Sequence, residues 1–318
     1  MCLCRGSAAM AERAPRSALL WASGGLLLTA LIWGTMTPLL KVLTEVIDVW
    51  LLAALRYVLG LPFLALCLLV AARPTQAPGK LNPGRLAILG LAMTAFSILY
   101  TIGVRYSHPV TAVVVLNFGP VISAVMARFM LGTRTAPGFP VALGLALVGG
   151  LMVLYGTPGT RERGLALEGG EPLLVIGQIC WQWYSIRAQQ WLGDRGQIGL
   201  STITSAVAAF WMVLVYVAMW GGGVAGGVPD TLTWREVAYL IWICVFGVAV
   251  AIVLWNVGVS RVGLPVAALH MNASPVFAVL TAAAIGLPPT ALQIAGGLLV
   301  LGGIVYMQLL QVRRARAG

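Results

Sequence analysis

Charged side chains are scarce in this sequence, and acidic ones are the scarcest. Of its 318 residues only 9% are charged, with 20 Lys and Arg against 9 Asp and Glu, while 60% are hydrophobic. Soluble domains carry roughly a quarter charged residues. A soluble chain this apolar could not cover its own surface with polar groups. The composition therefore predicts that lipid is the solvent for most of the chain.

The sequence also lacks the motifs of several enzyme and pump classes. It contains no Gly-x-x-x-x-Gly-Lys-Ser/Thr loop, which argues against a P-loop ATP-driven pump. Neither Gly-x-Ser-x-Gly nor His-Glu-x-x-His occurs, and no paired carboxylates suggest hydrolysis. The five cysteines show no metal-ligand spacing. We therefore expect no enzymatic activity, no metal site and no cofactor.

Ten apolar runs are long enough to cross a bilayer, which takes roughly 20 apolar residues per helix. They predict an all-α integral membrane protein with ten transmembrane helices. Several runs contain Pro or Gly, which membrane helices tolerate when neighbouring groups satisfy the freed backbone. The runs cover residues 19–40, 50–71, 86–104, 110–130, 139–155, 172–191, 200–220, 237–259, 264–287 and 292–310.

The distribution of basic residues predicts the orientation. With the N-terminus in the cytoplasm, fourteen of the 20 Lys and Arg residues fall on the inner side, counting Arg128 and Arg187 near the inner ends of their runs. Five fall outside, and Arg56 alone lies deep within a run. Cytoplasmic loops of membrane proteins are enriched in Lys and Arg. The pattern predicts that both termini are cytoplasmic. The topology also accounts for the net charge of +11, which therefore does not indicate nucleic-acid binding. We expect a lipid bilayer and no nucleic acid as partner.

The second half of the chain repeats features of the first at a nearly fixed spacing. At a shift of 155 residues, 99–104 aligns with 254–259 and 117–121 aligns with 272–276. Each half holds five runs, an odd number, so the second half must insert upside down relative to the first. Secondary transporters often use such inverted repeats for alternating access to a site near the bilayer midplane.

The predicted organisation is two inverted five-helix repeats between short tails. The boundaries are a cytoplasmic N-terminal tail over 1–18, a first repeat over 19–156, an external linker over 157–171, a second repeat over 172–311, and a basic cytoplasmic tail over 312–318.

Several short motifs suggest a family. They are ALIWGT at 30–35, LRY at 55–57, the Pro-Val steps at 120 and 275, and the Gly pair at 296. With these motifs the chain resembles the bacterial EamA family of the drug/metabolite transporter superfamily over nearly its full length. The family usually has Leu-Gly-Glu after the fourth and ninth helices, where this chain reads LGTR at 131–134 and GLPP at 286–289. Roles of those glutamates therefore cannot be carried over.

The resemblance implies ten helices, cytoplasmic termini, the bacterial cytoplasmic (inner) membrane and export of small metabolites. Arg56 is the sharpest candidate for contact with such a substrate, because a charge inside a span is costly unless it is paired or faces water or a ligand. An anionic substrate group is a natural partner, and we expect Tyr57 to belong to the same site. The alternative is that Arg56 extends to the outer headgroups or caps a neighbouring carbonyl.

Polar residues beside two prolines form a second candidate set. Asn117 and Asn272 each precede a proline, Pro120 and Pro275, by three residues. Proline cannot donate a backbone hydrogen bond, so these positions are predicted hinges. The amides either satisfy freed backbone groups or present polarity to a cavity. His270 either carries protons or is hydrogen-bonded within the core.

Deep aromatic residues complete the predicted site. Trp33 corresponds to Trp181 and Tyr100 to Trp255 in the repeat, with Tyr184 and Asn256 close by in sequence. They either line an amphipathic cavity or pack the core. Tryptophans near the ends of runs, Trp191 among them, are expected to anchor the protein at the membrane interface.

These features together predict a secondary exporter of small amphipathic metabolites such as amino acids or organic acids, with the substrate between the two halves. The alternatives are efflux of apolar drugs, or a non-transporting membrane scaffold. The expected partners are a small-molecule substrate and the bilayer, and a homodimer is a further possibility.

Overall fold

A computed structural model describes residues 16–70, 79–107, 109–157, 167–284 and 288–317. Within these ranges every regular element is a helix and no strand occurs, as the apolar runs predict. Most of the predicted tail over 1–18 and of the predicted linker over 157–171 lies outside the described residues.

Each predicted apolar run coincides with one helix or with consecutive helices. In chain order these are α2 (Arg16–Val46), α3 (Val49–Val70), α4 (Pro83–Arg105), α5 (Pro109–Asn117), α6 (Gly119–Leu131), α7 (Phe139–Tyr155), α9 (Glu171–Leu192), η1 (Gly193–Arg195), α10 (Gly196–Gly221), α11 (Trp234–Ile241), η2 (Trp242–Val250), α12 (Ala251–Val262), α13 (Leu264–Met271), α14 (Ser274–Ala284) and α15 (Ala291–Ala317).

By length and composition, seven helical stretches of the described chain can cross a membrane. One of them, Glu171–Gly221, is 51 residues long and contains both α9 and α10. The apolar helices Phe139–Tyr155 and Leu264–Leu280 are shorter. The protein is therefore a multi-pass membrane protein, while the number ten stays a prediction.

Two of the predicted runs are interrupted helices, and proline explains both breaks. Pro120 lies in the first turn of α6 and Pro275 in the first turn of α14. Neither can donate a hydrogen bond to the preceding helix. Around the breaks the backbone forms hydrogen bonds between residues three apart instead of four. They run from Phe118 N to the Val115 carbonyl (3.1 Å) and from Ala273 N to the His270 carbonyl (3.0 Å). That these breaks act as moving hinges remains a prediction.

The described chain divides into two compact units that each draw on both halves of the sequence. Unit 1 comprises residues 1–35, 108–167 and 257–318, and unit 2 comprises residues 36–107 and 168–256. Helices α2 and α12 both run through a boundary between units. This division is based on spatial contacts, whereas the two inverted repeats concern sequence order and remain a prediction.

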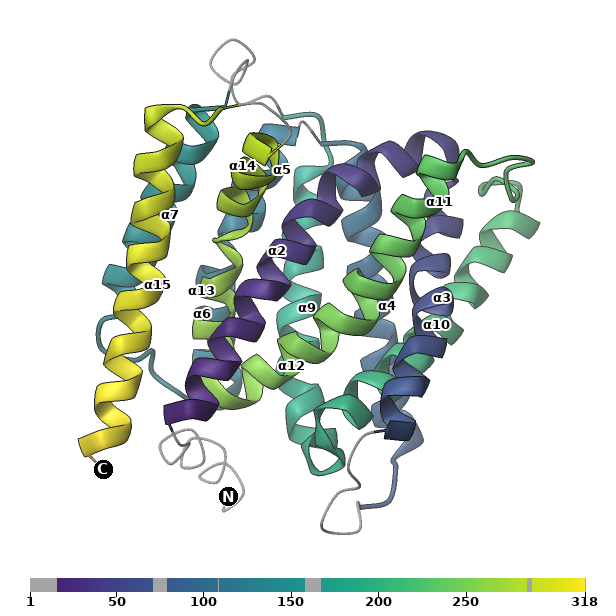
Figure 1. Cartoon of the computed structure of the whole chain (residues 1–318). Helices are drawn as coiled ribbons and strands as arrows, with labels where there is room; N and C mark the ends of the chain where they lie inside the picture. Colours follow the sequence, from purple (N-terminus) through teal and green to yellow (C-terminus); the bar gives the residue numbers. More distant parts are fainter. Residues whose placement is uncertain (1–15, 71–78, 108, 158–166, 285–287, 318) are drawn as a thin grey trace. The chain divides into compact units, whose positions relative to one another are not determined.

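In unit 1, α7 and α15 pack side by side (Figure 1). Small residues allow this contact, because a Cβ atom added at Gly149 would lie 2.5 Å from the carbonyl oxygen of Gly296. A Cβ at Gly303 would lie 2.7 Å from the carbonyl oxygen of Ala142. Glycine thus brings the two backbones together, as it commonly does between membrane helices.

In unit 2, α4 packs against α9, and α10 packs against α3 and α4. The π-helical segment η2 packs against α3. A Cβ at Gly60 would lie 2.9 Å from the carbonyl oxygen of Cys244 in η2. Wide π turns frequently occur at functional sites, and this one lies against the helix that carries Arg56.

Candidate substrate-binding site

Arg56 is buried within unit 2. It is the eighth residue of α3, so it lies about 10 Å along the helix from its first residue. Only 3% of its surface is exposed, so its guanidinium does not extend to the surface of the described structure, as reaching the headgroups would require. Tyr57, the next residue, is buried as well.

The guanidinium of Arg56 has few protein partners. Its Nη1 donates a hydrogen bond to Oγ1 of Thr101 at 3.2 Å. It also lies over the Tyr100 ring, with Cζ 5.8 Å from the ring centroid. Its Nε has no hydrogen-bond partner among the described residues. No Asp or Glu lies in the interior of a predicted span, so the chain offers Arg56 no carboxylate partner there. The guanidinium therefore has N–H groups left to bind an anion.

Two threonines fix the groups around Arg56. Thr101 donates its own hydroxyl hydrogen to the Ser97 carbonyl at 2.7 Å, which leaves its oxygen free to accept from Arg56. Thr37 shares a hydrogen bond of 2.8 Å with the Tyr100 hydroxyl. Helices α2, α3 and α4 thereby contribute to one polar cluster, which we call the arginine cluster (Thr37, Arg56, Tyr100, Thr101).

A row of aromatic rings leads from the arginine cluster deeper into unit 2. Phe96 lies 5.6 Å from Tyr100 and 4.7 Å from Trp181, measured between ring centroids. Trp181 in turn lies 5.2 Å from Tyr184 and 5.7 Å from Trp255. Such distances are typical of interacting aromatic pairs. Four of the predicted aromatic residues therefore come together in one unit.

Polar groups flank the far end of the aromatic row. Trp255 donates from Nε1 to Oγ of Ser185 at 3.0 Å. Asn256 donates from Nδ2 to Oγ of Ser201 at 2.9 Å. The Tyr184 hydroxyl shares a 2.9 Å hydrogen bond with Thr204. A row of aromatic rings with polar groups at both ends thus lies within unit 2.

The remaining predicted residues belong to unit 1. Asn117 is the last residue of α5, and a Cβ at Gly150 would lie 3.0 Å from its Nδ2. His270 is fully buried, and its Nδ1 bonds to the Val266 carbonyl at 2.8 Å. Asn272 lies in the break before α14, and neither polar atom of its side chain has a hydrogen-bond partner in the part of the chain described.

Trp33 also belongs to unit 1, so the repeat-related pair Trp33 and Trp181 is divided between the two units. Residues of unit 1 and unit 2 are therefore two separate groups of candidates. Unit 2 contains Arg56, Tyr57, Tyr100, Trp181, Tyr184, Trp255 and Asn256, and unit 1 contains Trp33, Asn117, His270 and Asn272.

Sequence reasoning missed several members of the site. Thr101 and Thr37 gave no signal, since hydroxyl residues are frequent in these helices. Phe96 could have been found, because it precedes Tyr100 by four residues and so shares its helix face.

Lys41, predicted to lie beyond the first helix, is part of α2, and its Nζ donates to the Arg105 carbonyl at 2.7 Å.

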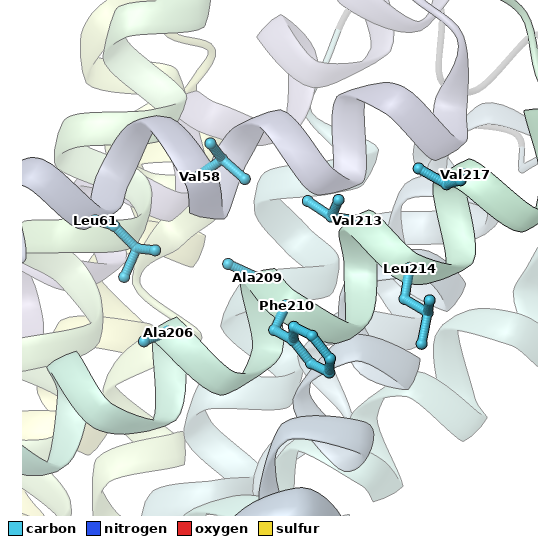
Figure 2. A pocket seen from close by; sticks show the side chains of 8 residues that line it. All are labelled: Val58, Leu61, Ala206, Ala209, Phe210, Val213, Leu214 and Val217. Atoms are coloured by element: carbon cyan, nitrogen blue, oxygen red, sulfur yellow. The ribbon is translucent and has the colours of Figure 1, made fainter.

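An apolar groove also occurs in unit 2. Figure 2 shows the eight side chains that line it, all from α3 and α10. None of the predicted site residues lines this groove, and its lining offers no polar side chain for a charged metabolite. The lining residues are Val58, Leu61, Ala206, Ala209, Phe210, Val213, Leu214 and Val217.

Comparison with known proteins identifies the family. The EamA-like transporter family matches residues 18–155 and 169–309. "Uncharacterized transporter YyaM" of Bacillus subtilis (strain 168) is 23% identical over 256 residues, which are 80% of this chain and 82% of that protein. "Uncharacterized transporter YetK" of the same organism is 22% identical over 266 residues, covering 83% of this chain and 79% of that protein.

A solved structure, described as "Crystal structure of protein", has the same fold. Its TM-score is 0.72 at 19% sequence identity, and the match covers 94% of this chain and 99% of that one. Together with the apolar helices, these findings bear out the resemblance seen in the sequence: the chain belongs to the EamA-like transporter family.

Proposed function

We propose that this membrane transporter exports small amphipathic metabolites, such as amino acids or organic acids, across the bacterial cytoplasmic membrane. The observation that carries the proposal is the buried guanidinium of Arg56, with one side-chain hydrogen bond and an unpartnered Nε. Leaving a buried charge without a counter-charge is strongly unfavourable. A carboxylate on the substrate would accept two hydrogen bonds from this group and neutralise it.

The aromatic row supports an amphipathic substrate rather than an inorganic anion. Beyond Tyr100, the rings of Phe96 and Trp181 offer apolar faces next to the arginine cluster. Binding sites for small molecules commonly combine such surfaces with a few well-placed polar groups. The carboxylate would bind Arg56 while the rest of the molecule lies along the rings.

Alternating access is the proposed mechanism. It is supported by the two segments matched by the family, 18–155 and 169–309, whose bounds are close to those of the two predicted repeats. Inverted repeats let a transporter open the same site first to one side and then to the other. The excess of basic residues on one side supports cytoplasmic termini.

A comparison of culture media tests this function. Cells that overexpress the protein and cells that lack its gene are grown in parallel, and secreted metabolites are quantified by mass spectrometry. We expect one or more carboxylate-bearing solutes to accumulate outside the overexpressing cells. No difference in any solute would favour the membrane scaffold, and a difference confined to resistance against apolar drugs would favour drug efflux.

A further inference from the structure

One end of unit 2 carries a concentration of positive charge around a tryptophan. Arg85 at the start of α4 lies over the ring of Trp191, with Cζ 5.4 Å from the centroid. Arg187, one helical turn before Trp191 in α9, lies over the same ring at 5.8 Å. Two guanidinium groups are thus gathered within about 11 Å of each other, the sum of these two distances.

Hydrogen bonds fix the segment that carries Arg85. Asp194 accepts a bond of 2.9 Å from Gly79 N through Oδ2, and Arg195 donates to the carbonyl oxygen of Gly79. Asn82 then caps α4 by accepting from Arg85 N at 3.0 Å. The segment before α4 is therefore held against the turn between α9 and α10, and Arg85 is held near Trp191.

The charge at this end is unbalanced. Lys80, Arg85, Arg187 and Arg195 are all positive, whereas Asp194 is the one acidic residue of the described segments 79–85 and 187–197. The Asp194 carboxylate already binds Gly79 N. Nε of Arg187 is buried and has no hydrogen-bond partner in the described chain. Like charges repel at such distances, so the arrangement suits a multivalent anion.

An apolar stripe continues from this charged end along both helices. On α9, Trp183 packs edge-on to Trp191 at 5.9 Å, and Ile179 and Ile176 follow toward the other end with exposed side chains. On α4, Ile88 and Leu91 follow Arg85 and are exposed too. Helices α4 and α9 pack against each other (Figure 1).

We propose that this end of unit 2 binds an anionic phospholipid, with the headgroup phosphate between Arg85 and Arg187 and an acyl chain along the exposed stripe of α4 and α9. Arginine binds phosphate oxygens with charge-assisted, often paired hydrogen bonds. Tryptophan favours the depth of the lipid headgroups. Basic clusters at the cytoplasmic ends of membrane helices attract anionic lipids, and the charge pattern predicts that this end is cytoplasmic.

The apolar stripe is what distinguishes a lipid from free phosphate. Inorganic phosphate would bind the two arginines alone, and contacts with Ile88, Ile179 or Trp183 would add nothing to its binding energy. A phospholipid gains from both parts of the surface, because burial of each methylene group against apolar side chains is favourable. Arg85 precedes Tyr100 of the arginine cluster by fifteen residues on α4, about 22 Å along the helix. The lipid site is therefore distinct from that cluster and does not depend on the transported substrate.

Native mass spectrometry of the purified full-length protein tests the proposal. Equal amounts of phosphatidylglycerol and phosphatidylcholine are added, and the molecules of each lipid that stay bound to the protein in the spectrometer are counted. We expect the wild type to retain phosphatidylglycerol at least about tenfold better, because each arginine near the headgroups adds to the attraction. The double variant Arg85→Gln/Arg187→Gln should lose this preference, and Arg85→Lys/Arg187→Lys should keep part of it.

Arg128→Gln is the matched control. Arg128 is exposed, is predicted to lie on the same side of the membrane, and bonds to the Gly132 carbonyl of its own helix end. This variant should keep the preference. The proposal is overturned if the wild type shows no preference, if the double glutamine variant keeps it, or if Arg128→Gln loses it equally. Displacement of phosphatidylglycerol by millimolar inorganic phosphate would also overturn it.

A second measurement covers the case in which the double glutamine variant fails to fold. Brominated phosphatidylglycerol should quench tryptophan fluorescence of the wild type more than brominated phosphatidylcholine does. The excess quenching should fall in Trp191→Phe, because both arginines lie over the Trp191 ring, while Trp183 on the same stripe keeps part of it. Equal quenching by both lipids, or unchanged excess in Trp191→Phe, would contradict the proposal.

Discussion

Arg56 in α3 donates a hydrogen bond to Thr101 in α4, 45 residues away, at a distance of 3.2 Å. Thr101 accepts this bond because its own hydrogen is directed to the Ser97 carbonyl. The threonine thus orients the buried guanidinium that the proposed substrate would bind. It acts through Arg56, so it is a positioning residue.

Replacing Thr101 by valine should therefore weaken both stability and transport. The side chain keeps its shape, but Arg56 loses its hydrogen-bonded side-chain partner, and leaving a buried donor unsatisfied costs about 1–3 kcal/mol. The free energy of unfolding should fall by about this amount, and the KM for substrate should rise. Thr101→Ser keeps the hydroxyl and should restore both quantities. Identical transport by the wild type and Thr101→Val would contradict the positioning role.

The hydrogen bond between Trp255 and Ser185 should be measurable as a coupling energy. A double-mutant cycle with Trp255→Phe and Ser185→Ala removes the indole donor and the hydroxyl acceptor, separately and together. We expect a coupling of about 0.5–1.5 kcal/mol in the unfolding free energy, as for a typical buried hydrogen bond. A coupling near zero would mean that the 3.0 Å contact does not stabilise unit 2.

The crossing of α7 and α15 should not tolerate a larger residue at Gly149. A Cβ atom there would lie 2.5 Å from the Gly296 carbonyl oxygen and 2.8 Å from Val300 N, so the backbones would have to separate. Gly149→Ala should destabilise the protein by about 1–3 kcal/mol, as overpacking does. Gly144→Ala on the same helix is the control, because a Cβ atom added at Gly144 would have no neighbouring atom within 4 Å among the described residues. Both are measured by thermal unfolding in detergent.

Lys41 should protect the end of α4 from hydrogen exchange. Its Nζ donates to the carbonyls of Val104 (3.1 Å) and Arg105 (2.7 Å), which lie where the helix leaves carbonyls unsatisfied. Lys41→Met should lower stability by about 1 kcal/mol and speed amide exchange around Arg105. Lys80→Met, near the other end of α4, should leave that exchange unchanged. Equal exchange in both variants would refute the capping role.

The sequence predicts the helices far better than it predicts their partners. Apolar runs locate α3, α4 and α7 to within a few residues, because a membrane helix must be apolar over its whole length. Likewise, the prolines at 120 and 275 predict disturbed helices, since proline lacks a backbone donor. A partner such as Thr101 for Arg56 depends on how α3 and α4 pack, which no local pattern specifies.

The residues of the candidate site could be predicted only in part, because their grouping depends on helix packing. The buried charge of Arg56 and the deep aromatics at 100, 181, 184 and 255 could be found from composition and repeat spacing. The division of all the predicted site residues between two compact units, with Trp33 in unit 1 and Trp181 in unit 2, could not be found from the sequence. Spatial grouping of helices depends on contacts between distant segments, and the repeat describes sequence order only.

Transport by the purified protein tests the central claim most directly. Proteoliposomes are loaded with a mixture of the standard amino acids and common organic acids, and efflux is followed by mass spectrometry for wild type, Arg56→Gln, Arg56→Lys and the control Arg128→Gln. We expect wild type and control to release one or more carboxylate-bearing solutes, Arg56→Lys to release them slowly, and Arg56→Gln to be reduced by about tenfold or more, since a charge-assisted hydrogen bond is lost. Equal release by Arg56→Gln and wild type would contradict the account.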